Sequence, residues 1–413
     1  MKAGSPFLFV ILFFCTSSIN AQGKLVIVEN ADSLVGKVID GENARELIGN
    51  VRFSQENVRV SCDRALQYLD RGLVVLTGNV VVQDDSIILR APRGLYHSDS
   101  RRAEAFDDVS LTDGTTNVTS KYGQYFIEPK IATFRTDVAV KDTGSVLTSD
   151  TLTYFRTEKR SVAERNVAIY NKQDDVTIYG EHFENFAPQQ FSRMTGEPYL
   201  VQFDRDPRGR IDTLVVRCRV MESYQDSTRR LVAIDSVEIV RSDLAAIGGL
   251  ATFFTVGDSI LLRQVPVVWY RQSQVSGDSI NVYLKERALH IVAVLGNAFA
   301  ISQNDTLRPS RFDQITGETL HMFFEDQELD KITVDTRAIS VYHLYEDSAA
   351  NGLNKTSGDR LVLDFVFGQV SAIRIYGGVE GQYVPENLVQ GHEMEYAIAG
   401  FNWREERPRI TRK

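Results

Sequence analysis

The chain has 413 residues, of which 43% are hydrophobic and 24% are charged, and its formal net charge is −9. Hydrophobicity and charge near globular averages exclude wholesale disorder, and 3 cysteines are too few for a disulfide scaffold. The acidic balance argues against a general nucleic-acid-binding protein, which needs a basic surface to meet phosphate. The 16 tyrosines and 22 phenylalanines, together with many valines and threonines, are typical of β-sheet.

The first 21 residues read as an export signal. A lysine precedes the apolar run Pro6–Cys15, and a small polar segment follows and ends at Ala21. The run is too short for a lasting membrane anchor, so we expect cleavage near Ala21 and a soluble exported protein. Removing residues 1–21 leaves a charge of −10 and two cysteines, Cys62 and Cys218, which we expect to be buried free thiols.

A repeat of 29 residues organises the first half of the chain. Five valines follow one another at this constant step, each preceded by Asn or Asp and followed two positions later by an apolar residue. The pairs are Val51 and Phe53, Val80 and Val82, Val109 and Leu111, Val138 and Val140, and Val167 and Ile169. Sixteen residues after the last four valines stand Tyr96, Tyr125, Tyr154 and Phe183.

Turn-rich segments interrupt the repeat every 14 or 15 residues, for example at 70–72, 84–86 and 98–100. Two strands per repeat joined by tight turns must run antiparallel. Each strand is long and has a polar or glycine break at its middle, which suits a bulge or bend. We therefore predict an all-β, elongated jellyroll of bent antiparallel strands built from 29-residue repeats, with an apolar interior. A β-solenoid of 29-residue coils is the alternative that the composition permits.

The pattern loosens beyond residue 190 without vanishing. Equivalent segments recur at larger and variable steps, at residues 235–239, 265–268, 296–300, 336–340 and 377–379. A Pro/Gly/Arg-rich stretch, 191–210, separates them from the regular part. The predicted division is a signal peptide (1–21), a module of regular repeats (22–190), a second, divergent β-jellyroll module (191–400) and a polar tail (401–413).

The sequence contains no recognisable motif for catalysis or metal binding. The 6 histidines are scattered, and phosphate-binding, dinucleotide-binding and nucleophile-elbow motifs are missing. Paired acids, such as Asp84–Asp85, Asp107–Asp108 and Asp174–Asp175, recur at equivalent turns or bends. We interpret them as solvated turn residues rather than as glycosidase carboxylates. The expectation is a protein that is not an enzyme and has no metal and no cofactor.

Three segments of the repeat, Leu76–Val80, Arg90–Tyr96 and Ala103–Val109, resemble the organic-solvent-tolerance (OstA-like) family. Its members are β-jellyroll proteins that bridge the periplasm in lipopolysaccharide transport. The resemblance covers about residues 30–190 well and the second half loosely. The segments Gly377–Glu386 and Gly400–Arg404 look like the ends of longer OstA-like proteins of outer-membrane bacteria.

The resemblance implies a periplasmic protein, which can also associate with the outer membrane. It would bind lipopolysaccharide, shield the acyl chains in an apolar groove and help to bridge the inner and outer membranes. The implied partners are the lipid A acyl chains, other jellyroll components paired through edge strands, and a second copy of the chain. The candidate groove residues are Val51, Phe53, Val80, Val82, Val109, Leu111, Val138, Val140, Val167, Ile169, Tyr96, Tyr125, Tyr154 and Phe183. The alternative is a structural or carbohydrate-binding β-repeat protein at the cell surface, which would have a filled interior.

Overall fold

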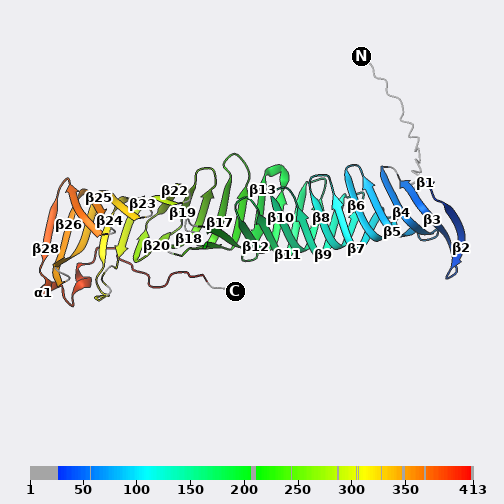
Figure 1. Ribbon diagram of the computed structural model, residues 1–413. Helices are drawn as coiled ribbons and strands as arrows, with labels where there is room; N and C mark the ends of the chain where they lie inside the picture. Colours follow the sequence, from blue (N-terminus) through cyan, green and yellow to red (C-terminus); the bar gives the residue numbers. More distant parts are fainter. Residues whose placement is uncertain are drawn as a thin grey trace, which may run out of the picture.

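The computed structural model describes residues 27–410 except 56, 206–210, 243, 286–287, 304, 306, 327, 347–348 and 367–368. It is an elongated stack of antiparallel strands that runs from β1 (Ile27–Asn30) and β2 (Ser33–Ile39) at one end to β28 (Glu380–Val384) at the other (Figure 1). The expected signal peptide lies outside the described residues. Within them, no helix is long and apolar enough to cross a membrane.

In the regular part, strands of 10 to 14 residues pair with their neighbours in sequence. These strands are β3 (Glu42–Gln55), β4 (Val58–Tyr68), β5 (Leu73–Asp84), β6 (Ile87–His97), β7 (Arg102–Thr112), β8 (Asn117–Phe126), β9 (Ile131–Lys141), β10 (Ser145–Phe155), β11 (Arg160–Asn171) and β12 (Val176–Phe186). The antiparallel pairing of consecutive strands confirms the predicted jellyroll and excludes the solenoid, whose coils would pair in parallel.

Beyond residue 190 some strands are divided into two halves. β12 pairs along one half with β13 (Phe191–Thr195) and along the other with β14 (Tyr199–Arg205). The strands that follow are β15 (Ile211–Arg217), β16 (Val220–Tyr224), β17 (Arg230–Val240), β18 (Leu244–Phe254), β19 (Ser259–Arg263), β20 (Val267–Tyr270), β21 (Ser273–Ser276), β22 (Ser279–Lys285), β23 (Ala288–Ser302), β24 (Asp313–Glu325), β25 (Glu328–Glu346), β26 (Ala349–Val366) and β27 (Gln369–Tyr376). The short helices are η1 (Ala187–Gln189), α1 (Glu386–Val389) and η2 (Glu393–Tyr396). Strand pairing thus continues across residue 190, and the division into two modules stays a prediction.

The strands bend where two successive residues adopt the left-handed backbone conformation. In the regular copies these pairs are 49–50, 78–79, 107–108, 136–137 and 165–166, immediately before each repeat valine. Gly, Asn and Asp tolerate this conformation best, which explains why Asn or Asp precedes each valine. The line of bends continues at 235–236, 264–265, 296–297, 336–337 and 377–378, in or beside the expected segments. A further pair, 196–197, lies in the stretch that the sequence indicated as a boundary.

A polar contact from the neighbouring strand holds many of these bends. Four of them share the same amide–carboxylate pair: Asn50 with Asp32, Asn79 with Asp63, Asn166 with Asp150, and Asn297 with Asp278. At the bend formed by Asp107 and Asp108, the acidic residues lie in the bend itself and the neighbouring strands supply the cations. Arg93 contacts Asp107 at 2.7 Å, and Lys121 contacts Asp108 at 2.9 Å. The acidic side chains at these bends therefore have a structural role.

The bent strands form two facing layers with the main hydrophobic core between them. Cys62 and Cys218 are both free and buried in this core, as expected. A second core lies on the outer side of one layer near the C-terminal end: in β23, Ala298 and Ala300 face the main core while Phe299 and Ile301 face the second. The chain after η2 covers this outer core and runs back along the molecule (Figure 1).

Candidate functional site

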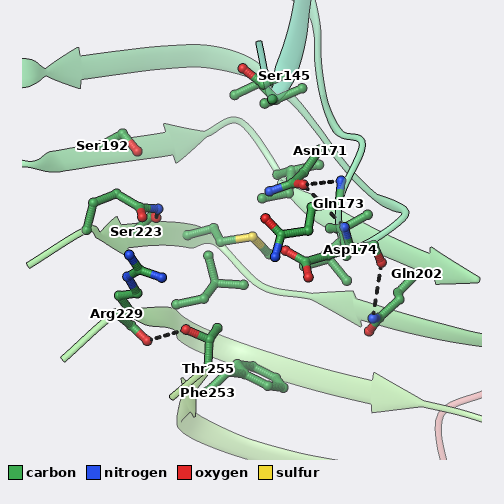
Figure 2. Close-up of a pocket in the computed structure, with 18 of the residues that line it drawn as sticks. Ser145, Asn171, Gln173, Asp174, Ser192, Gln202, Ser223, Arg229, Phe253 and Thr255 are labelled. Atoms are coloured by element: carbon green, nitrogen blue, oxygen red, sulfur yellow. Dashed lines mark hydrogen bonds between the residues drawn. The ribbon is translucent and has the colours of Figure 1, made fainter. Parts of the chain in front are cut away.

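A groove of 2230 Å³ opens into the interior in the middle of the molecule, and Figure 2 shows part of its lining. The residues that line it run from Leu111 to Leu289. Because neighbouring strands lie about 4.8 Å apart, this stretch is roughly 60 Å long. Its inner surface is largely aliphatic and aromatic, and half-buried side chains such as Leu147, Ile178 and Leu214 have unfilled space beside them. The groove can therefore hold an elongated apolar ligand.

Polar hairpin turns form the two edges of the groove. The first rim consists of the turns around residues 113–116, 142–145 and 171–174, and the second rim of those around 225–230 and 255–259. In the first-rim turns an Asp or Asn side chain accepts hydrogen bonds from backbone N–H groups two and three residues later (Figure 2 shows Asn171). Although burial opposes the effect, these bonds lower the pKa of Asp113 and Asp142.

The second rim carries exposed positive charge. Arg229, labelled in Figure 2, lines the mouth of the groove, and its backbone carbonyl accepts a hydrogen bond from the hydroxyl of Thr255 at 2.7 Å. Lys285 is a second exposed cation that lines the groove. Within the described residues no group of His, Cys, Asp and Glu is placed to hold a metal ion.

N-terminal to the groove, the two rims contact each other through side chains. The hydroxyl of Tyr96 donates to the amide oxygen of Gln55. One repeat later, the hydroxyl of Tyr125 lies 2.8 Å from Oδ2 of Asp84, and Nη1 of Arg156 lies 2.9 Å from the same oxygen. We call the Asp84–Tyr125–Arg156 contact the latch.

The latch corrects the interpretation of Asp84 as a solvated turn residue. Its side chain is buried, because a phenol and a guanidinium enclose the carboxylate at the point where the two layers meet. Burial, together with the hydrogen bond to Asp84, raises the pKa of Tyr125 to about 12. The hydroxyl therefore remains a donor over the whole neutral range. Asp107–Asp108 and Asp174–Asp175 lie at a bend and at an exposed turn, as interpreted from the sequence.

The fourteen candidate groove residues fall into two groups. Five line the groove: Leu111, Val140, Tyr154, Ile169 and Phe183. Nine are buried in the main core and do not line it: Val51, Phe53, Val80, Val82, Tyr96, Val109, Tyr125, Val138 and Val167. That all fourteen contact lipid stays a prediction.

Much of the groove comes from residues that the repeat does not single out. Ile178 and Leu200 line it from β12 and β14, and Leu214, Leu231 and Phe253 line it from β15, β17 and β18. Each lies in an apolar, strand-like stretch, which was the only signal available. Ile178 is not one of the repeat positions, and beyond residue 190 the constant step is lost, so the sequence could not rank these residues.

Residues 23–181 match the family model described as OstA-like protein. This part of the chain belongs to the OstA-like family. The OstA-like segment contains the latch and the start of the groove, which continues beyond it to Leu289.

Among solved structures, the chain is similar to LptH from Pseudomonas aeruginosa. That protein is described as the LptA homologous periplasmic component of the conserved lipopolysaccharide transport device. The identity is 14% and the TM-score is 0.25, over 34% of this chain and 95% of that chain. Comparison with curated proteins gives no match.

Proposed function

We propose that this chain is a periplasmic lipopolysaccharide-transport protein that shields acyl chains in its central groove and helps to bridge the inner and outer membranes. The observation that carries the proposal is the groove itself, with an apolar interior of 2230 Å³ between two polar rims. Each CH₂ group that leaves water contributes about 0.8 kcal/mol, so a lipid with several chains binds well without a basic pocket. The OstA-like match supports a transport role rather than catalysis.

The charge distribution favours a lipid that is held by its tails. The net charge of −10 that remains without residues 1–21 repels lipid phosphates over most of the surface. Arg229 and Lys285, at the mouth of the groove, supply local positive charge that offsets this repulsion for a phosphorylated head group whose chains lie inside. The structural or carbohydrate-binding alternative requires a filled interior, which describes the first two repeats but not residues 111–289.

The two ends of the stack support the proposed partners. Within the described residues β2 pairs only with β3, and its Leu34 and Val38 side chains are 57% and 72% exposed. At the other end β27 and β28 pair only with β26, and Ile373 and Tyr383 are exposed. Such edges allow pairing with other jellyroll components or with a second copy.

The test is binding of purified lipid A to residues 22–413. Ile178→Asp and Leu214→Asp each place a charge inside the groove, and we expect each to weaken binding at least tenfold. Leu307→Asp is the matched control, since this leucine is 85% exposed in a turn that does not line the groove, and the variant should bind as the parent does. Circular dichroism and unfolding midpoints verify that the variants fold. Absence of binding, or equal binding by all four proteins, would reject the proposal.

A further inference from the structure

Four successive copies of the repeat have an equivalent pair of residues near the two rims, but the contact within this pair differs between the copies. In each copy an aromatic residue lies near the second rim, and the residue 41 positions earlier lies near the first rim. The pairs are Gln55 with Tyr96, Asp84 with Tyr125, Asp113 with Tyr154, and Asp142 with Phe183. Only the first two pairs are bonded in the described structure, whereas all four residues of the last two line the groove.

The length of the first-rim turn explains the difference. Asp84 ends β5, and only two residues separate it from β6. Asp113 belongs to a longer turn, in which Oδ1 accepts hydrogen bonds from the backbone N–H groups of Thr115 and Thr116 at 2.9 Å. Its carboxylate is therefore occupied within its own turn and leaves Tyr154 facing the groove. Asp142 is occupied in the same way.

In the fourth copy the contact is chemically impossible, because Phe183 has no hydroxyl group. Arg156 lies between the copies in which the residue pair is bonded and the copies in which the pair lines the groove. From the second rim it reaches Asp84 at 2.9 Å and Asp85 at 3.3 Å, so it closes the interior just before the groove begins. At the far end of the lining, Tyr270 packs edge-on against Phe324 with ring centroids 5.8 Å apart.

We propose that the lipid site is a chamber limited to residues 111–289 and that the latch closes its N-terminal end. Lipid then enters and leaves sideways between the rims, and its passage along the stack toward β1 requires the latch to open. This inference rests on the proposed function and narrows it. It assigns the acyl chains to the part of the interior that contains Leu111, Tyr154 and Phe183, and excludes them from the part that contains Phe53 and Val82.

The first test uses residues 22–413 without substitution. Purified lipid A carrying a diazirine on an acyl chain is bound and irradiated, and the labelled residues are mapped by mass spectrometry. We expect label between residues 111 and 289 only. Label at Phe53 or Val82 would overturn the chamber while leaving lipid binding intact. Absence of label from the whole protein would overturn the proposed function and this inference with it.

The second test opens the latch. In the double variant Tyr125→Phe/Arg156→Gln the buried Asp84 carboxylate loses both cross-rim partners. We expect label at Val82, two residues before Asp84, to rise at least tenfold above the parental level. Arg160→Gln is the matched control, because Arg160 bonds Glu158 and Glu184 on the same rim without crossing the groove, and its labelling should equal that of the parent.

Tyr125→Phe alone keeps the Asp84–Arg156 pair and should give a smaller rise, so the inference remains testable if the double variant does not fold. Parental labelling in a folded double variant would overturn the role of the latch. The same holds if Arg160→Gln spreads the label as far as the double variant does.

Discussion

The side-chain amide of Asn79 donates a hydrogen bond to Oδ2 of Asp63 over 2.9 Å, across a bend where Gly78 and Asn79 both have left-handed backbone. A methyl group on Gly78 would lie 2.3 Å from that same carboxylate oxygen. The bend is therefore specified twice, by a residue that tolerates positive φ and by a neighbour that needs the space that glycine leaves. Related pairs recur along the stack, so the curvature of the interior depends on them.

Gly78→Ala should lower the free energy of unfolding by about 1–3 kcal/mol, because alanine is strained at this φ and also contacts Asp63. Gly36→Ala is the control: it lies in β2 with no atom within 4 Å of the added Cβ, and we expect little change. Urea unfolding followed by circular dichroism compares the midpoints. Equal midpoints for Gly78→Ala and the parent would contradict the role given to the bend.

The sequence predicts the bends well but the groove poorly, and the reason is physical. Each bend needs a left-handed pair, and the residues that tolerate it recur at a fixed step. Whether the interior is open depends instead on the rims, where Asp84 and Asp113 occupy equivalent positions but bond to different partners. The turn that contains Asp113 has two more residues than the turn that follows Asp84, and a pattern of apolar positions does not reveal this difference in length.

The periodicity of the sequence does not predict the outer core either, because this core joins segments that are distant in the chain. Gln274 in β21 contacts the backbone of Asn402 and Arg404, which lie about 130 residues further along. The sequence indicated a polar tail from residue 401. Its aromatic residues nevertheless pack on the fold, with the ring centroids of Phe401 and Phe312 5.2 Å apart.

Tyr125→Phe should cost about 1 kcal/mol at pH 8, because it removes one buried hydrogen bond and leaves Asp84 paired with Arg156. The pKa of Tyr125 is raised by burial and by Asp84 from 10.0 to about 12, so folding favours the protonated phenol. This contribution to stability is complete below pH 10 and is lost as the pH rises from 10 to 12.

The difference in unfolding midpoint between the parent and Tyr125→Phe should therefore shrink over pH 10–12, as followed by thermal unfolding. Tyr376→Phe, at an exposed position on β27, controls for the general effect of alkali. A difference that stays constant from pH 8 to 12 would show that the titration of Tyr125 is not linked to folding.

The two thiols should be inert in the folded protein. Cys62 and Cys218 are buried and donate to backbone carbonyls two residues later, and burial raises the pKa of each to about 11. At pH 8 only about one thiol in a thousand is then ionised, and the thiolate is the reactive form. We expect no maleimide labelling of residues 22–413 within an hour, and two labels in guanidinium chloride. Val256→Cys provides an accessible thiol as a control, and rapid labelling of either native cysteine would contradict this packing.

The chain has 2 tryptophans, and both lie where the C-terminal segment meets the outer face, so intrinsic fluorescence reports on its docking. Trp269 is buried and donates from Nε1 to the carbonyl of Arg404 at 3.3 Å. Trp403 packs against Phe312 with ring centroids 5.3 Å apart. Release of the segment would expose both rings to water and shift their emission to longer wavelength.

Gln274→Ala should release this segment. The buried Gln274 amide donates to the carbonyl of Asn402 at 2.7 Å and accepts from the N–H of Arg404 at 2.8 Å, so truncation leaves two backbone groups without partners and costs about 2 kcal/mol. We expect red-shifted fluorescence and tryptic cleavage after Arg404, while Gln83→Ala, at an exposed position on β5, behaves as the parent does. Unchanged fluorescence and unchanged cleavage in Gln274→Ala would show that the aromatic contacts of Trp403 hold the segment. The amide contact would then contribute little, because water would replace each hydrogen bond to Gln274.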